Sequence, residues 1–315
     1  MRLITADEIK RIGLSPSCCV DWVRESFLMK DRAQLPAKIS LHPQGGDFFN
    51  TMPCVLPEEY NIFGVKVVHR IKDAVPTLGS EILLYNSKTG ELLAMLDGDW
   101  ITTMRTGAVA TLAIQTFRRS GKLVYSFIGL GNTARATLLC LLDSEPMAEH
   151  EVLLLKYKDQ EIDFMSRFSS YKNVTFTPCS TIEEIIERSD VVVSCITEAD
   201  GLLCEDSTKF KKGCLVVPVH TKGFQNCDLF FDKVYADDTA HVSGFKYFNS
   251  FRQYAEIRDV LVGNCAGRHS DEERILSYNI GLALHDVLFA YRVIEKLKGS
   301  SCEVTWEKES NKFWI

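Results

Sequence analysis

The sequence lacks any long apolar run. No segment approaches the eighteen or so uninterrupted apolar residues of a membrane-spanning helix, although 46% of the 315 residues are hydrophobic. The first residues, MRLITADEIKRIG, also lack the continuous apolar core and the small-residue cleavage site of a signal peptide. We therefore expect a globular, cytoplasmic protein that does not cross a membrane.

An excess of positive charge is also absent. Lysine and arginine number 36 against 42 aspartates and glutamates, which gives a formal net charge of -6. Binding to a phosphate backbone needs a basic field, and no stripe rich in lysine and arginine occurs in the chain. The composition therefore disfavours nucleic acid as a partner and favours a small molecule.

Paired cysteine motifs are missing too. The chain has eleven cysteines, an odd number, without a C-x-x-C pair or a cluster of cysteine and histidine at metal-ligand spacing. We expect reduced thiols, such as Cys140 and Cys195, and no metal site.

The chain is long enough for two domains, and changes in its hydrophobic periodicity separate a first part from a second. Residues 6–30 have a helical pattern interrupted at Pro16, and three stretches between residues 48 and 98 have the apolar content of strands. Residues 102–117 are rich in helix formers and are followed by a short polar break. The first part of the chain is therefore predicted to be a mixed, largely β unit.

From residue 122 the sequence alternates between apolar strands and amphipathic helices as far as VVPV, residues 216–219. This alternation is typical of a doubly wound α/β domain with a buried parallel sheet. The last long pattern, from residue 270 to residue 298, predicts one or two helices that begin at Ser270 or Asp271.

The stretch SFIGLGNTARATLLCLL, residues 126–142, places G-x-G-x-x-A between an apolar strand and a helix. A glycine pattern alone is a weak signal, because tight turns also need glycine, but this strand-to-helix context is the one that dinucleotide binding requires. A structural turn remains the alternative. If a cofactor binds, its phosphates meet the free N–H groups at the helix start. The predicted cofactor loop comprises Gly129, Leu130, Gly131, Asn132, Thr133 and Ala134.

The end of the next strand bears on which dinucleotide binds. An acidic residue there accepts the ribose hydroxyls of NAD, whereas a basic residue accommodates the extra phosphate of NADP. The strand ends in Lys156, Tyr157 and Lys158, which favours NADP through Tyr157 and Lys158. Asp159 could still serve NAD, and both lysines could be solvated surface charges.

Over nearly its whole length the chain resembles the ornithine cyclodeaminase/mu-crystallin family. The matching stretches include TMPCVLP, GVKVV, LYNSKTGELLAMLDGDWITTMRTGAVATLA, FIGLGNTA and GRHSDEERILSYNIGLALHDVLFAYRV. The resemblance implies a homodimer and a Rossmann-like nicotinamide domain, here residues 118–273. It also implies a substrate and dimerisation domain of mixed α+β structure, residues 1–117 with 274–315.

The activities implied by this resemblance are of three kinds. The first is NAD(P)-dependent oxidation or reduction at the α-carbon of an amino or imino acid, including reduction of cyclic ketimines. The second is cyclodeamination of ornithine to proline. The third is non-catalytic binding of NADP.

Hydride transfer at such a carbon needs cations for the substrate carboxylate, and the chain offers candidates. Lys66 interrupts a valine-rich strand and Arg105 lies in an otherwise small and apolar helix, so both could alternatively be snorkelling surface charges. The resemblance places both on the substrate carboxylate. It also places Lys38, where relatives carry an arginine, as well as Met52 and Thr77, on the substrate side.

The loop after strand CLVVPV departs from the family pattern. A gapless match puts Lys222 where ornithine cyclodeaminase has an aspartate for the substrate nitrogen, and a cation cannot pair with an ammonium. Asp228 or His220 could replace that aspartate, although Asp228 could simply cap a turn and His220 could bond backbone. Alternatively, Lys222 could attract a second carboxylate, as in an opine-like imine.

Four further residues match family positions near the nucleotide. Ser194, Cys195 and Thr197 follow a buried strand where relatives contact nicotinamide or ribose, although core packing explains Cys195 equally well. Asp286 matches a helix that borders the nucleotide site.

Overall fold

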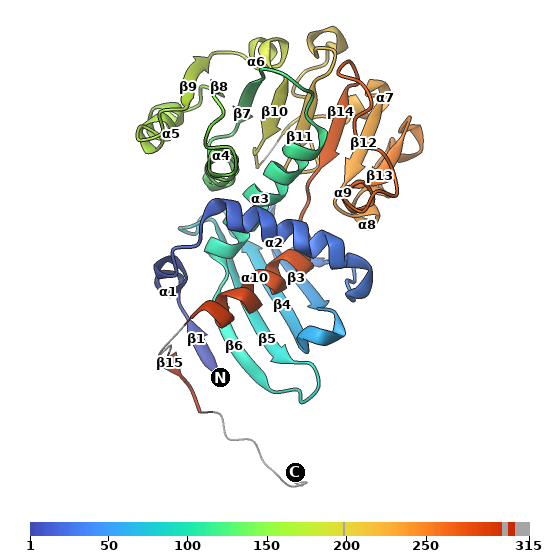
Figure 1. Ribbon diagram of the computed structural model, residues 1–315. Helices are drawn as coiled ribbons and strands as arrows, with labels where there is room; N and C mark the ends of the chain where they lie inside the picture. Colours follow the sequence, from blue (N-terminus) through green and yellow to red (C-terminus); the bar gives the residue numbers. More distant parts are fainter. Residues whose placement is uncertain (198, 298–301, 306–315) are drawn as a thin grey trace. The chain divides into compact units, whose positions relative to one another are not determined.

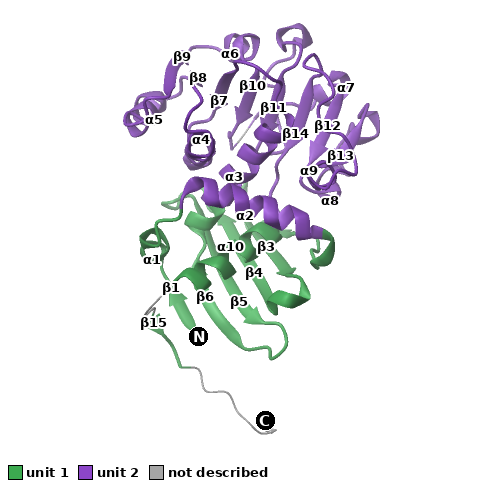
Figure 2. Cartoon of the chain, in the orientation of Figure 1, with its two compact units in different colours: residues 1–14, 31–102, 283–315 green, residues 15–30, 103–282 purple. Residues whose placement is uncertain are grey.

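The computed structural model describes residues 1–197, 199–297 and 302–305. The chain folds into two compact units (Figure 2). Unit 1 consists of residues 1–14, 31–102 and 283–315, and unit 2 consists of residues 15–30 and 103–282. Each unit is assembled from segments that are distant in the chain.

In the described part of unit 1, one sheet runs in the order β15-β1-β6-β5-β4-β3-β2 (Figure 1). The pairing of β1 with β6 is parallel, and the other pairings are antiparallel. The elements are β1 (Arg2–Ile4), α1 (Ala6–Arg11), β2 (Ile39–Leu41), β3 (Phe48–Val55), β4 (Ile62–Arg70), β5 (Leu78–Asn86), β6 (Leu92–Asp97), α10 (Ala283–Lys296) and β15 (Cys302–Glu303).

Helix α10 covers one face of this sheet. Alternate residues of each strand point toward this helix. Along β4 the buried residues are Ile62, Gly64, Lys66 and Val68, while their neighbours are only partly buried. A Cβ on Gly64 would lie 2.7 Å from a methyl carbon of Val287, so glycine permits the close approach of the helix. The core of unit 1 therefore lies between α10 and this face.

Unit 2 contains a parallel sheet of eight described strands in the order β13-β12-β14-β11-β10-β7-β8-β9. The strands are β7 (Val124–Ile128), β8 (His150–Leu155), β9 (Val174–Cys179), β10 (Val191–Ser194), β11 (Leu215–Pro218), β12 (Lys233–Ala236), β13 (Tyr254–Glu256) and β14 (Ile275–Tyr278). The helices are α2 (Pro16–Met29), most of α3 (Asp99–Phe117), α4 (Asn132–Ser144), α5 (Gln160–Arg167), α6 (Ile182–Arg188), α7 (Cys227–Phe230), α8 (Thr239–Val242) and α9 (Ile257–Leu261).

The strand order of unit 2 reverses between β7 and β10. The chain leaves β7 for β8 and β9 on one side, and it returns through α6 to β10 on the other side. In such sheets ligands bind outside the carboxyl ends of the strands at this switch point. The predicted doubly wound α/β fold is confirmed.

The prediction of one or two helices beginning at Ser270 or Asp271 was wrong at its start. Residues 275–278 form strand β14, which lies between β11 and β12 with all four residues buried, and the helix α10 begins only at Ala283. A short buried apolar run has no helical or alternating period, so the sequence pattern alone does not distinguish the two structures.

The observed units differ from the expected domain limits at three places. Helix α2 packs on α4 and belongs to unit 2, as do residues 103–117 of α3. Residues 274–282 also belong to unit 2, because β14 is a strand of its sheet.

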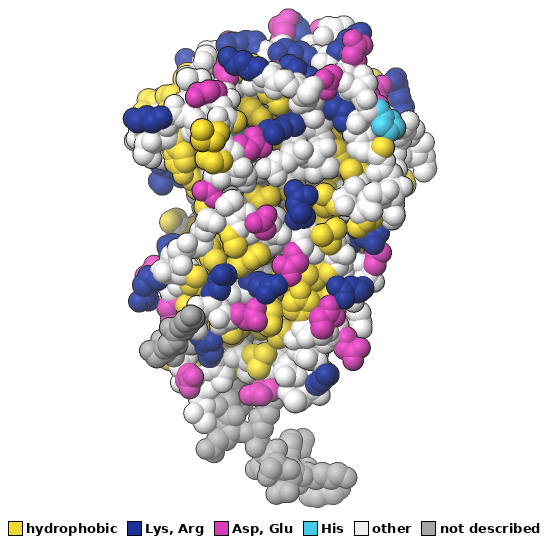
Figure 3. Space-filling view, in the orientation of Figure 1, with side chains coloured by type: hydrophobic (Ala, Val, Ile, Leu, Met, Phe, Trp, Pro, Cys, Tyr) yellow, Lys and Arg dark blue, Asp and Glu magenta, His cyan; other side chains and the backbone are white. Residues whose placement is uncertain are grey.

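The surface agrees with the composition. On the face shown in Figure 3, acidic side chains lie among the basic ones. Among the described helices, none is both long and apolar enough to span a membrane. In the described ranges, no group of histidine, cysteine and carboxylate side chains has the arrangement of a metal site.

Candidate functional site

The turn from β7 to α4 forms a cradle at the switch point of unit 2. Gly129 has a φ of +84°, and a Cβ there would lie 2.9 Å from the backbone of Cys195 and Ile196. The helix begins after Gly131, and within the described residues no side chain caps its first N–H groups. Free N–H groups at a helix N-terminus bind phosphate through hydrogen bonds and the helix dipole.

The other residues of this turn suit a dinucleotide. Leu130 and Ala134 are buried and hold the turn against the sheet, whereas Asn132 and Thr133 lie in the first turn of α4. A Cβ on Gly131 would meet no described atom within 4 Å, which leaves space over the helix start. The cradle therefore has the open space and the free N–H groups that a pyrophosphate needs.

The loop after β8 is exposed and has an unusual backbone. Lys158 and Asp159 have φ values of 51° and 59°, the left-handed region that residues with a Cβ rarely adopt. The ammonium of Lys158 lies 5.0 Å from the centre of the Tyr157 ring. The backbone N–H of Tyr157 donates to the carboxylate of Glu161, a residue that is largely buried. The side chains of Tyr157 and Lys158 are thus available to a ligand.

The ends of β10 and β11 bring Ser194 and His220 together. Ser194 Oγ lies 2.7 Å from His220 Nε2, and the backbone N–H of Lys222 donates to His220 Nδ1 at 3.3 Å. Burial lowers the pKa of His220 to about 4, so the ring is neutral at pH 7. Cys195 is half-buried, whereas Thr197 and the side chain of Lys222 are exposed.

Asp228 lies in α7, where its side chain is buried. Its carboxylate accepts a hydrogen bond from the hydroxyl of Tyr278, at 2.8 Å. Burial raises the pKa of Asp228 to about 7, and the hydrogen bond from Tyr278 opposes this effect. Asp228 therefore titrates in the range where many enzymes work.

In unit 1, Lys66 is fully buried at the centre of β4. Its ammonium lies 2.7 Å from the carboxylate of Asp286, which α10 carries over the sheet and which is also fully buried. Met52 is the β3 partner of Lys66 and is buried beside it. Lys66 and Asp286 form an ion pair that is enclosed in an otherwise apolar core.

The two other predicted substrate residues of unit 1 lie in connecting segments. Lys38 is half-buried just before β2, and Thr77 is exposed just before β5, where its hydroxyl donates to the Ala74 carbonyl.

Arg105 is buried in α3, within unit 2. A Cβ on Gly281 would overlap the Nη1 atom of Arg105, so the guanidinium lies directly against the Gly281 backbone. The N–H of Gly281 in turn donates to the buried carboxylate of Asp237, which also lies 3.2 Å from Nδ1 of His241. This segment after β14 thus fixes the position of Arg105.

Sequence reasoning missed several of these partners. Asp286 was expected beside the nucleotide rather than as the ion-pair partner of Lys66, and Gly281 and Asp237 were not identified as supports of Arg105. A buried acid on an otherwise apolar helix was the available signal for Asp286. The sequence carried no comparable signal for the contact between Gly281 and Arg105.

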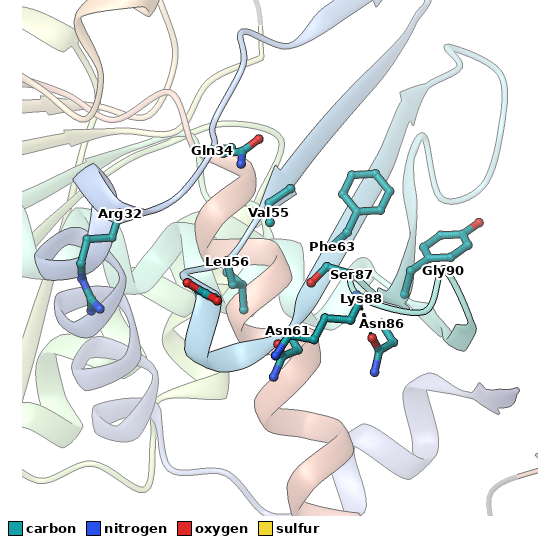
Figure 4. Close-up of a pocket in the computed structure, with 12 residues that line it drawn as sticks. Arg32, Gln34, Val55, Leu56, Asn61, Phe63, Asn86, Ser87, Lys88 and Gly90 are labelled. Carbon is teal, nitrogen blue, oxygen red and sulfur yellow. Dashed lines mark hydrogen bonds between the residues drawn. The ribbon is translucent and has the colours of Figure 1, made fainter.

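A surface pocket of about 680 Å³ in unit 1 contains none of the predicted site residues. In Figure 4, Val55 of β3 and Phe63 of β4 contribute side chains to this pocket from neighbouring strands. Both residues belong to the sheet face that α10 does not cover.

Comparison with known proteins shows which family the chain is similar to. The model of the ornithine cyclodeaminase/mu-crystallin family matches residues 5–301. The nodulation efficiency protein NfeD of Rhizobium meliloti is 25% identical over 271 residues, which cover 82% of this chain and 83% of that protein. The N-((2S)-2-amino-2-carboxyethyl)-L-glutamate dehydrogenase of Staphylococcus aureus is 22% identical over 285 residues, 84% of each chain.

Solved structures share the fold. The Δ1-pyrroline-2-carboxylate reductase of Thermococcus litoralis, in complex with NADH and L-proline, superposes with a TM-score of 0.83 at 21% identity, over 94% of this chain and 97% of that one. An archaeal alanine dehydrogenase dimer with bound NAD superposes with a TM-score of 0.81 at 23% identity, over 97% and 99%.

The raised pKa of Asp228 makes a prediction for stability. Since the folded state holds this proton more tightly than the unfolded state, stability is lost as the pH rises from about 4 through 7. D228N removes this dependence. Between pH 5 and pH 8, its free energy of unfolding therefore rises by on the order of 2 kcal/mol relative to that of the wild type. Thermal denaturation at both pH values, with exposed Asp73→Asn as the control, measures the change. Parallel pH profiles for wild type and D228N contradict the assignment.

Proposed function

Because the chain belongs to the ornithine cyclodeaminase/mu-crystallin family, we propose that it is an NAD(P)-dependent oxidoreductase acting on an amino or imino acid. The observation that carries the proposal is the cradle at the β7–α4 turn, where Gly129 and the uncapped start of α4 are arranged for a pyrophosphate. The bound nicotinamide supplies the hydride acceptor or donor for the α-carbon of the substrate.

From the family resemblance, Lys66 of unit 1 and Arg105 of unit 2 are each proposed as a cation for the substrate carboxylate, with Lys38 as a further one. The Lys66 ammonium lies 2.7 Å from the Asp286 carboxylate within the apolar face of unit 1. The Arg105 guanidinium, fixed against Gly281, can hold a carboxylate through two hydrogen bonds. Met52 and Thr77 are proposed to contribute to the substrate pocket. In this assignment residues 1–117 and 274–315 serve the substrate and the dimer, and residues 118–273 serve the dinucleotide.

The cofactor is proposed to be NADP. The exposed Lys158 and Tyr157 follow β8 at the place that meets the 2′ position of the ribose, and a cation there favours a phosphate. The remaining contacts are assigned to residues 129–134 and to Ser194, Cys195 and Thr197. Two structural neighbours contain NADH and NAD, and they give no support for NADP. The proposed preference for NADP therefore rests on the residues of this chain.

Ornithine cyclodeamination is the alternative reaction. It requires a group that accepts the substrate ammonium, and Lys222 stands where the family resemblance predicts an aspartate. Asp228, with a pKa raised to about 7, is the acid/base candidate for that chemistry, and His220 is the second. Non-catalytic binding of NADP is the third possibility, and the buried cations Lys66 and Arg105 argue against it.

A second substrate class follows from Lys222. Its exposed side chain can attract a second carboxylate, and the Staphylococcus relative is named for an opine-like dehydrogenase substrate with several carboxylates. In this hypothesis K222D lowers activity on dicarboxylic imines while activity on monocarboxylic imines persists. An unchanged ratio of the two activities excludes a role for Lys222 in substrate choice.

The assembly is proposed to be a homodimer formed through the sheet face of unit 1 that α10 does not cover. Phe49 and Met95 are each 39% exposed on strands β3 and β6, and Phe63 and Tyr85 of the neighbouring strands contact each other on the same face. A second copy is the occupant that we propose, and a structural neighbour is a dimer. All eleven cysteines, which lie within the described ranges, are free thiols, and this supports a cytoplasmic location.

The first experiment combines nucleotide titration with an activity assay. We expect NADPH to quench the protein fluorescence at lower concentration than NADH, and we expect reduction of a cyclic imino acid to consume the reduced nucleotide in equal amount. Proline formed from L-ornithine in excess of added cofactor would instead establish cyclodeamination. Binding of neither nucleotide would exclude the proposed function.

The contact between Gly281 and Arg105 gives a test of carboxylate binding. G281A introduces a Cβ that overlaps the guanidinium, so we expect the KM of the imino acid to rise about tenfold or more, corresponding to loss of a charge-assisted contact. G263A is the matched control, because Gly263 also has a positive φ but its Cβ would meet no described atom within 4 Å. Equal KM values for the two variants would remove Arg105 from the substrate site.

Sedimentation velocity tests the dimer. The wild type is expected to sediment at twice the mass of the chain, while the double substitution F63E/M95K places charges on the uncovered face and yields monomers. Leu229→Lys, an exposed apolar residue of unit 2, is the control and is expected to remain dimeric. A monomeric wild type would disprove the assembly.

A further inference from the structure

Ser194 and His220 form a hydrogen-bonded pair with a defined direction. The two residues stand at the carboxyl ends of the adjacent parallel strands β10 and β11, where Ser194 is fully buried and His220 is half-buried. Ser194 Oγ and His220 Nε2 are 2.7 Å apart. Either atom could be the donor from this distance alone, so the direction depends on the other ring nitrogen.

The backbone of Lys222 determines that direction. Its N–H can only donate, so His220 Nδ1, at 3.3 Å, must be the acceptor. A neutral imidazole carries one proton, which is therefore on Nε2. Nε2–H then donates to Ser194 Oγ. The low pKa of His220, about 4 because of burial, agrees with a neutral ring.

The turn that presents the Lys222 N–H is itself constrained. Gly223 has a φ of +94°, and a Cβ there would lie 2.9 Å from the side chain of Leu203. The N–H of Gly223 donates to the side chain of Gln225, and its carbonyl accepts from the N–H of Leu203. Because both peptide groups of Gly223 are held, the Lys222 N–H keeps its orientation toward the ring.

This arrangement leaves the Ser194 hydroxyl hydrogen to point away from His220. A hydroxyl has one hydrogen to donate and two lone pairs, and the Nε2–H group occupies one of the lone pairs. Ser194 is the register partner of Ile128 at the end of β7, and the N–H of Cys195 donates to the Ile128 carbonyl. The Ser194 backbone is therefore next to the Gly129 cradle, at the switch point of the sheet.

We propose that His220 is a positioning residue that makes Ser194 a hydrogen-bond donor to the carboxamide oxygen of the bound nicotinamide. This inference rests on the proposed function, since it needs a nicotinamide cofactor. The carboxamide has one carbonyl acceptor, and a donor of fixed direction sets the orientation of the ring to which it is attached. His220 then acts through Ser194 and not as the acid/base of the reaction.

The opposite direction of the hydrogen bond between Ser194 and His220 would require a different protonation of the ring. If His220 activated Ser194 as a base, Nε2 would need a lone pair and Nδ1 would carry the proton. The Lys222 N–H would then face a second N–H group and lose its acceptor. The backbone of the turn therefore favours a donating His220 over a proton-accepting one.

Nucleotide binding to four variants tests the proposal. S194A and H220L each remove one hydrogen bond, and we expect each to raise the dissociation constant of the preferred reduced nucleotide about fivefold to tenfold. H220Q keeps an N–H donor of similar reach, and we expect it to stay within about twofold of the wild type. The double variant S194A/H220L should bind no more weakly than S194A, because both changes remove the same donor to the carboxamide.

A second measurement needs no cofactor. Nitrogen-15 NMR of the histidine side chains at pH 7 is expected to show a neutral His220 ring with its proton on Nε2. A proton on Nδ1, or wild-type affinity in S194A, overturns the proposal. If H220L fails to fold, H220N replaces it, since the shorter amide does not reach Ser194. Wild-type protein that binds neither nucleotide disproves the proposed function as well. A dissociation constant that is the same in the wild type and in all four variants disproves the positioning role alone.

Discussion

The close approach of Gly129 to the backbone of Cys195 and Ile196 is the constraint on which the nucleotide unit depends. A side chain at residue 129 would overlap that backbone, and its positive φ is a conformation that glycine adopts more readily than other residues. The contact brings the end of β7 against the end of β10 and aligns the start of α4 with the switch point. The same contact places Ser194, and through it His220, at the edge of the cradle. One glycine thus connects the start of α4 with the pair of Ser194 and His220.

The charges of the two units are stabilised in different ways. In unit 1, Lys66 has an opposite charge 2.7 Å away on a helix that closes over the sheet. In unit 2, Arg105 lies against a peptide backbone that an acidic residue holds in place. The first arrangement compensates a buried charge directly, and the second fixes its geometry. In both arrangements, groups of the protein surround the cation in place of water.

Much of the fold could be predicted from the sequence, because strands β7 to β11 and their helices have clear periods. The β7–α4 turn was also predictable, since its glycines follow an apolar strand. Strand β14 was not, because ILSY is short and buried on both faces. The partnership of Lys66 with Asp286 joins residues 220 positions apart, so no local pattern could reveal it. The same holds for Arg105 and Gly281, whose contact depends on the left-handed conformation of a loop.

The discontinuous make-up of unit 1 has a consequence for synthesis on the ribosome. Strands β1 to β6 emerge early, but α10 follows after the whole of residues 103–282. Until α10 arrives, the sheet face with Lys66 lacks both its apolar cover and the carboxylate of Asp286. The nascent chain therefore holds an apolar face, with Lys66 at its centre, that its covering helix has not yet reached. Closure of unit 1 is coupled to translation of its C-terminal helix, so a chain truncated before α10 would expose the sheet face that carries Lys66.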